Sequence, residues 1–179
     1  MPRARGLEPD GEQLTQGFTI LVTGPSPSDI EAVAREIDGG LRARGVATEL
    51  IDSRTPGAGA LRAEGAATFA AGALARHGVV TVLALPAPSR VARDRAREAL
   101  GRLIEVHVSS EGTVGCGYEP PLRAEVEVVF PDPHGSVTGA DRTLRTLELL
   151  GFLTHEPAGA YSEEEEREVI KRLKAFGYL

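Results

Sequence analysis

The sequence predicts an α/β fold in three layers, with a mostly parallel sheet of five strands between two layers of helices. Short runs rich in Val, Ile and Leu alternate along the chain with longer segments whose apolar residues recur at helical spacing. Strands that alternate with helices form parallel sheets joined by right-handed crossovers. The chain has 179 residues, of which 41% are hydrophobic, enough for one domain with its own core.

Five apolar runs are expected to be strands, because each has the length of a strand and is followed at once by Gly, Asp, Pro or Ser. The expected strands are residues 18–23, 46–51, 79–85, 104–108 and 124–130. The third run begins with four β-branched residues in a row, so we expect it to be central in the sheet.

Four segments between the strands have the pattern of helices. They are residues 29–44, 61–76, 89–103 and 138–150. The first of them should be amphipathic and should end at Gly45. Its apolar face would consist of Ile30, Val33, Ala34, Ile37 and Leu41.

Both ends of the chain are predicted to lie outside the domain, which would span residues 17–153. Residues 1–16 are polar and contain Gly and Pro, so we expect a flexible lead-in. Residues 154–179 are expected to form a C-terminal extension with an amphipathic helix, which begins at Ser162 and four glutamates. The apolar face of this helix could dock on the domain, on a second copy in a homodimer, or on another protein.

Composition excludes several classes of function. The net charge is −6 without a basic stripe, which argues against nucleic-acid binding. No apolar run is long enough for a membrane span, and no apolar stretch follows the first residues, so a cytoplasmic protein is expected. The abundance of Ala, Arg and Gly is typical of a bacterial source.

Cysteine and histidine show no metal or catalytic pattern. Cys116 is the single cysteine, which excludes a disulfide framework. The histidines are far apart and lack ligand spacing, so we expect them to be structural or on the surface. They are His77, His107, His134 and His155.

Residues 24–31, Gly-Pro-Ser-Pro-Ser-Asp-Ile-Glu, lie between the first strand and the first helix, where a phosphate-binding P-loop would lie. A working P-loop needs a Lys for the β- and γ-phosphates and a hydroxyl for Mg²⁺. Here Ile30 holds the Lys position and Glu31 holds the hydroxyl position. The sequence therefore predicts a P-loop scaffold without its catalytic side chains.

Other residues of this loop also oppose phosphate binding. Pro25 and Pro27 remove backbone donors. Asp29 and Glu31 place negative charge at the helix N-terminus, where a phosphate would bind. Three interpretations stay open: an ordinary helix start, which we favour, a weak nucleotide site without catalysis, and an active kinase.

Several segments across residues 17–153 together resemble the adenylylsulfate (APS) kinase family. The segments are Gly-Phe-Thr-Ile-Leu-Val-Thr-Gly at 17–24, Ala-Pro-Ser-Arg-Val-Ala-Arg-Asp at 87–94 within a gapless match over 78–94, Leu-Ile-Glu-Val at 103–106, Tyr-Glu-Pro-Pro at 118–121, and Leu-Gly-Phe-Leu at 150–153. The resemblance implies a P-loop kinase-like fold. It also implies the family's reaction, in which ATP phosphorylates the ribose 3′-hydroxyl of APS to give PAPS.

The resemblance implies a site at the carboxyl ends of the strands, where ligands bind in open parallel sheets. A nucleotide would lie on the degenerate loop residues Gly24, Ser26 and Ser28, and the substrate on Asp52, Arg54, Pro88 and Arg90. Arg93 is a further candidate for a sulfate or phosphate contact. The alternative for Arg90 and Arg93 is a solvated charge paired with Asp94 or Glu98.

This chain departs from the family pattern at positions of function. The family has Asp-Gly-Asp where residues 52–54 read Asp-Ser-Arg, so Asp52 is either a remnant metal ligand or, as we favour, a loop acid. Ala63, Gly65 and Ala66 align with the family's Asn and Arg-Arg substrate contacts. Residues 109–117 are too few for the family's two-helix lid.

We therefore expect a non-catalytic APS kinase-like domain linked to sulfate activation, which either senses an adenylyl-sulfate nucleotide or binds protein partners. Weak binding of ATP, ADP, APS or PAPS is compatible with this expectation, whereas Mg²⁺, a catalytic residue and a metal ligand are not expected. One alternative is a divergent active kinase that uses Arg54, or an Arg of another subunit, as its missing cation. The other is a dimerisation or scaffold domain that acts through its C-terminal helices.

Overall fold

The computed structural model describes the chain from the first strand to the last helix of the predicted domain. The described residues are 16–57, 59, 65–84, 87–109, 117–131 and 138–153. Three predicted segments lie largely or wholly outside these residues. They are the lead-in except Gln16, the short segment expected in place of a lid, and the C-terminal helix. Those expectations stay predictions.

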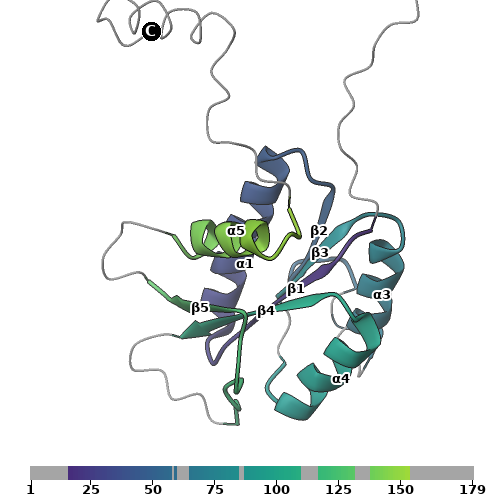
Figure 1. The fold of residues 1–179 in the computed structure, drawn as a ribbon. Helices are drawn as coiled ribbons and strands as arrows, with labels where there is room; N and C mark the ends of the chain where they lie inside the picture. The colour runs from purple at the N-terminus through teal and green to yellow at the C-terminus, as the bar shows by residue number, and fades with distance from the viewer. Residues whose placement is uncertain are drawn as a thin grey trace, which may run out of the picture.

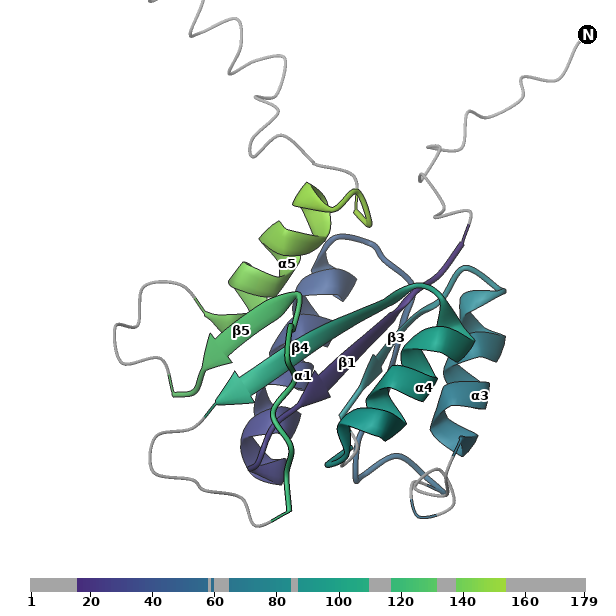
Figure 2. The same cartoon turned by 60° about the horizontal axis from the view of Figure 1, so that its bottom comes forward.

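The sheet has five strands, all parallel, in the order β2-β3-β1-β4-β5 (Figures 1 and 2). The strands are β1 (Thr19–Thr23), β2 (Thr48–Ile51), β3 (Val80–Leu83), β4 (Leu103–Ser109) and β5 (Val126–Val129). The predicted parallel α/β sheet is confirmed, but the prediction of its centre is wrong, because β1 holds that place. An all-apolar run shows that a strand is covered on both faces. It does not show which interior position the strand takes.

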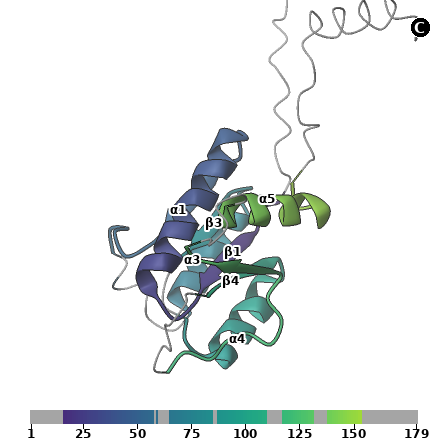
Figure 3. The same ribbon diagram turned by 90° about the vertical axis from the view of Figure 1, so that its left-hand side faces the viewer.

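Helices cover both faces of the sheet and confirm the three-layer architecture. They are α1 (Pro27–Ala43), α3 (Ala66–Ala75), α4 (Arg90–Leu100) and α5 (Gly139–Leu149). α1 packs beside α5 on one face, and α3 packs beside α4 on the other (Figure 3). None of the helices in the described part is long and apolar enough to cross a membrane.

The larger hydrophobic core lies between the sheet and the α1/α5 layer. The predicted apolar face of the first helix is buried there, together with Ile20 and Val22 of β1 and with Leu144 and Leu147 of α5. α5 ends before Gly151, whose φ of 72° suits a helix stop. Leu153 is buried after that stop, as its apolar position after the predicted glycine indicated.

The opposite face of the sheet, under α3 and α4, holds a smaller apolar cluster and is partly polar. Its apolar cluster consists of Leu21, Ile51, Ala71, Leu83 and Leu103. Arg93 and Glu105 are also buried on this side. Because charge is rarely buried without a partner, these two side chains need close partners of opposite charge.

Three helix boundaries differ from the predicted ones by two residues or more. α3 begins at Ala66, not at residue 61, because Gly65 before it has a φ of 82°. α1 begins at Pro27, two residues earlier than expected, because proline suits the first helical position. α4 ends at Leu100, since Gly101 has a φ of 67°. Leu103, which was expected at the end of that helix, instead begins β4.

Candidate functional site

The candidate site is the edge of the sheet formed by the carboxyl ends of the strands. All five strands run in the same direction, so their ends and the starts of α1 and α4 meet there (Figure 2). The loop after β1, Asp52 after β2, and Pro88 before α4 all belong to this edge. The topology thus brings the residues predicted for the site to one edge, and their roles in binding remain predictions.

The loop between β1 and α1 has only three residues, Gly24, Pro25 and Ser26. A Cβ atom on Gly24 would lie 2.3 Å from the carbonyl oxygen of Val108, so glycine is needed for the close approach of β4. Ser26 is the N-cap of α1, but its side chain makes no capping hydrogen bond. Its Oγ lies 3.1 Å from the Oγ of Ser28.

The two positions that would carry P-loop chemistry have other partners. Ile30 is buried in the larger core between α1 and the sheet. Glu31 forms an ion pair with Arg35 one turn later, with 2.7 Å between Oε2 and Nη2. Neither side chain supplies the lysine amine or the hydroxyl that a working P-loop needs.

Asp52 lies at the end of β2 and is only 3% exposed. Its Oδ2 is 3.2 Å from Arg35 Nη2 and 3.2 Å from Arg54 Nε, and its Oδ1 accepts from the Arg54 backbone N–H at 2.9 Å. Burial opposes the charged form, but the bonds from Arg54 and Arg35 outweigh it and lower the pKa of Asp52. The result is a chain of alternating charge, Glu31–Arg35–Asp52–Arg54.

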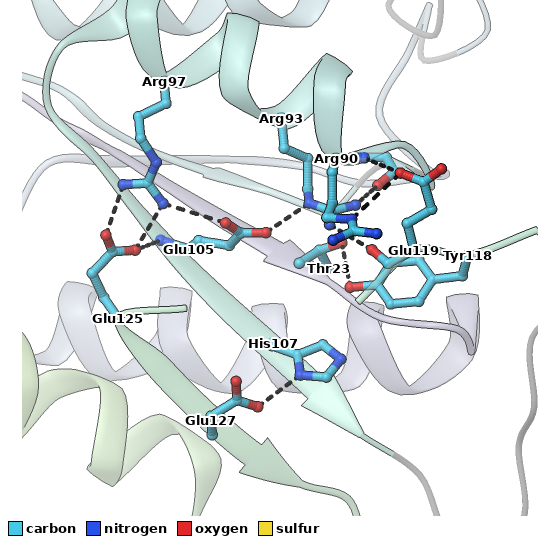
Figure 4. A network of polar contacts seen from close by, with 11 residues as sticks. Thr23, Arg90, Arg93, Arg97, Glu105, His107, Tyr118, Glu119, Glu125 and Glu127 are labelled. Carbon is cyan, nitrogen blue, oxygen red and sulfur yellow. Dashed lines mark hydrogen bonds and ion pairs between the residues drawn. The ribbon is translucent and has the colours of Figure 1, made fainter. Parts of the chain in front are cut away.

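The start of α4 is held by Glu119. The Arg90 backbone N–H donates to Glu119 Oε2 at 3.0 Å, and Arg90 Nε lies 3.6 Å from the same oxygen (Figure 4). The backbone N–H of Glu119 donates to the carbonyl of Pro88 at 2.9 Å. The exposed guanidinium of Arg90 is thus paired across the edge.

Arg93 is buried, which the sequence did not indicate. Its Nε lies 2.7 Å from Glu105 Oε1, and its terminal nitrogens donate to the carbonyls of Ala87 and Glu119 at 2.7 and 2.6 Å. The alternative of a solvated charge paired with Asp94 or Glu98 is therefore wrong for Arg93. That residue lies on the side of α4 that faces the sheet, where Glu105 projects from β4 (Figure 4).

A second guanidinium extends this network to β5. Arg97 bridges Glu105 at 3.3 Å and Glu125 at 2.7 Å. The Glu105 backbone N–H also donates to Glu125 at 2.7 Å. Burial would raise the pKa of Glu125, but the bonds from Arg97 prevail and lower it. The network joins α4, β4 and the residues before β5.

An aromatic and hydroxyl cluster completes the edge between β1 and β4. Thr23 Oγ1 donates to the Tyr118 hydroxyl at 3.1 Å, and the Arg93 guanidinium lies 5.3 Å from the centre of the tyrosine ring. The ring of His107 is nearly parallel to that of Tyr118, with centroids 5.9 Å apart. His107 Nδ1 lies 2.6 Å from Glu127 Oε2. Burial raises the pKa of Tyr118, so the phenol stays neutral.

The donor set of this edge does not fit a divalent cation. In the described ranges, no group of three or more His, Cys, Asp or Glu side chains could hold a metal ion. Mg²⁺ is bound through free carboxylate oxygens and water, whereas the carboxylate of Asp52 is shared by two guanidinium groups. The guanidinium groups of Arg54 and Arg90 stay partly exposed at this edge, and a guanidinium is a group that binds anions.

The chain matches no protein-family model. It is 28% identical over 185 residues to a probable adenylyl-sulfate kinase of Pyrococcus abyssi. The matched region covers 92% of this chain and 99% of that protein. The structure also resembles a hexameric APS kinase from Thiobacillus denitrificans with a TM-score of 0.65 and 25% identity, covering 80% of this chain but only 31% of that one. The APS kinase of Mycobacterium tuberculosis solved with AMPPNP and APS has the same fold, with a TM-score of 0.57 and 16% identity over 76% of this chain and 98% of that one.

Proposed function

Because the chain is homologous to adenylyl-sulfate kinases, we propose that it is a non-catalytic domain that binds an adenylyl-sulfate nucleotide, APS or PAPS. In this role it would sense the nucleotide and would not phosphorylate it. The observation that carries the proposal is the chain of ion pairs Glu31–Arg35–Asp52–Arg54. These residues follow β1 and β2, the region in which the proposal puts the phosphates.

The phosphate side of the site argues against catalysis. Phosphoryl transfer depends on positioned cations and donors around the phosphates. Here Ile30 packs in the core and Glu31 brings a negative charge. Loss of one preorganised donor lowers a rate by about 10²–10³. The combined loss of the lysine and the metal-binding hydroxyl therefore supports an inactive domain.

The surroundings of Asp52, the candidate remnant of a metal ligand, also argue against catalysis. A Mg²⁺ ion at Asp52 would have to displace Arg35 and Arg54, whose guanidinium groups are each 3.2 Å from the carboxylate. The low pKa of Asp52 reflects how strongly these groups compensate its charge. We therefore expect any nucleotide to bind without Mg²⁺.

Two arginines support anion binding at the same edge. Arg54 and Arg90 pair through Nε with Asp52 and Glu119, and their side chains are still 67% and 43% exposed. A guanidinium has five donors in a planar fork. Its terminal nitrogens can bind a phosphate or sulfate oxygen while Nε keeps its pair.

Two assays on the purified chain test the proposal. Calorimetric titration should detect binding of APS or PAPS without Mg²⁺, and a chromatographic assay with ATP, Mg²⁺ and APS should show no PAPS above background. Formation of PAPS would favour the divergent kinase, in which Arg54 or an arginine of another subunit supplies the missing cation. Absence of binding to both nucleotides would contradict the sensor.

Variants show whether the proposed residues take part. Arg54→Gln and Arg90→Gln should each weaken binding about tenfold, because each removes a charged hydrogen-bond donor. Arg42→Gln is the matched control: Arg42 pairs with Asp38 near the end of α1, away from the edge. Equal affinity in all three variants would remove these arginines from the site.

A further inference from the structure

His107 and Glu127 form a pair at the same edge that no sequence pattern indicated. Thr23, His107 and Glu127 are neighbours in register across β1, β4 and β5. Residues in register on parallel strands point to the same face, here the face covered by α4. The imidazole Nδ1 and the Glu127 carboxylate are 2.6 Å apart. Figure 4 shows the second ring nitrogen pointing away from Glu127.

The position of the imidazole is fixed from several sides. Glu127 holds Nδ1, and the ring of Tyr118 lies nearly parallel to it at 5.9 Å. Tyr118 is itself fixed by the hydrogen bond from Thr23, the residue before the degenerate loop. The side chain of His107 is only 14% exposed, whereas that of Glu127 is 60% exposed. A ring held through one nitrogen presents the other in a defined direction.

This pair differs from the other cations of the edge. Arg35, Arg54 and Arg90 are charged at every physiological pH and share their charge with carboxylates. Histidine is the side chain whose charge changes between about pH 5 and pH 8. Protonation of His107 would thus add one positive charge beside the loop and supply an N–H donor at Nε2.

We propose that His107, when protonated, donates from Nε2 to a phosphate or sulfate oxygen of the bound nucleotide, so that the site binds its anion more tightly at low pH. The inference rests on the proposed function, since it assumes an adenylyl-sulfate ligand at this edge. Glu127 is the positioning residue, because it orients the ring and compensates its charge. The ligand chemistry is that of a phosphosulfate or phosphate group.

The other charges around the ring leave Glu127 as its counter-ion. Glu105 precedes His107 by two residues on the same face of β4, but it is paired with Arg93 and Arg97. Arg93, which comes from α4, lies over the ring of Tyr118. The raised pKa of Tyr118 keeps this phenol uncharged across the pH range considered.

APS is the ligand that tests this inference. Its phosphosulfate group carries no proton that titrates between pH 5.5 and 8.0, whereas a terminal phosphate has a second pKa of about 6. The dissociation constant would be measured calorimetrically at both pH values, without Mg²⁺. The full chain should bind APS about tenfold more tightly at pH 5.5, the gain expected for one charged hydrogen bond.

Three variants separate this role from a structural one. His107→Gln should bind APS equally at both pH values, with an affinity close to that of the parent chain at pH 8.0. Glu127→Gln should reduce the ratio of the APS dissociation constant at pH 8.0 to that at pH 5.5, because the imidazolium loses its counter-ion. His77→Gln is the control: His77 is exposed beyond the end of α3, and it should keep the full ratio.

The outcomes distinguish this inference from the proposed function. Binding of APS that does not change with pH, or a ratio that persists in His107→Gln, would overturn the role of His107 and leave the sensor intact. No binding of APS at either pH would overturn the role of His107. The proposed function would then depend on binding of PAPS, which the calorimetric titration measures separately.

Discussion

Arg93 carries its charge inside the protein, where only 3% of the residue is exposed. It pairs with Glu105 and donates to the carbonyls of Ala87 and Glu119. A buried ion pair adds little to stability compared with a well-packed apolar pair, but removal of one partner leaves an uncompensated charge. Arg93 therefore connects α4 with β4 and with the segment that contains Tyr118.

Arg93→Met should lower the free energy of unfolding by about 3–5 kcal/mol, because Glu105 would stay buried without its main partner. Urea unfolding at pH 7 measures this change. Arg95→Met is the control on the same helix, and it should cost less than about 1 kcal/mol, since Arg95 is exposed. Equal losses in the two variants would contradict the role given to Arg93.

Asp52 should make stability depend on pH. Its pKa is lowered in the folded state, so its stabilisation is present above the unfolded pKa of about 3.9 and is lost as the pH falls through the folded pKa. The difference in unfolding free energy between the parent chain and Asp52→Asn should therefore be largest above about pH 5 and shrink below about pH 4. Urea titrations from pH 7 to pH 3 measure it, and a constant difference would be contrary to the ion pairs described.

Residue types and spacing led to part of the site, but the partners in it could not be predicted. Asp52 directly follows the second predicted strand, and Arg90 follows the third after a short loop, so their place at the sheet edge follows from topology. The pairs His107–Glu127 and Arg93–Glu105 depend on strand register and on which side of α4 faces the sheet. Neither is encoded in a local pattern.

At the scale of elements, the start of α1 decides what the loop can do. The helix begins at Pro27 and leaves three loop residues after β1. Proline favours this early start since it lacks an N–H and has a helical φ. The sequence pattern placed Ile30 on the apolar face of this helix, and because Ile30 is buried there, a lysine at this position would disturb the core.

Ile30→Lys should lower stability by at least about 3 kcal/mol, because it places an unpaired charge in the larger core. It should not restore formation of PAPS. Glu31→Ser is the matched change at the next position, and it should cost no more than about 1 kcal/mol. Urea unfolding and the chromatographic assay would measure both variants. A stable Ile30→Lys protein that makes PAPS would show that the loop can still act as a P-loop.

The helix starts also differ in how they are capped. In α5, Thr138 accepts from the Asp141 N–H at 3.1 Å, and Asp141 accepts from the Thr138 N–H at 3.3 Å. Ser89 precedes α4 without a side-chain capping bond. Thr138→Ala should therefore cost about 1 kcal/mol, and Ser89→Ala markedly less. Thermal unfolding of both variants tests this, and the reverse order would refute the assigned caps.

At the scale of the whole molecule, the fold class was predictable and the order of the strands was not. Alternating strands and helices imply a parallel sheet with two helical layers, and both are present. β1 and β3 are both buried runs of the same kind. The choice between them for the centre depends on crossovers that connect distant parts of the chain, which a local pattern does not contain.

The central proposal is that this domain binds an adenylyl-sulfate nucleotide and does not catalyse phosphoryl transfer. The most direct measurement is a thermal-shift panel with ATP, ADP, APS and PAPS, each with and without Mg²⁺. We predict a rise in melting temperature with APS or PAPS that does not need Mg²⁺. At a free ligand concentration of 100 times the dissociation constant, binding would add about 2.7 kcal/mol to the free energy of unfolding. A Mg²⁺-dependent shift with ATP, or no shift with any nucleotide at millimolar concentration, would contradict the claim.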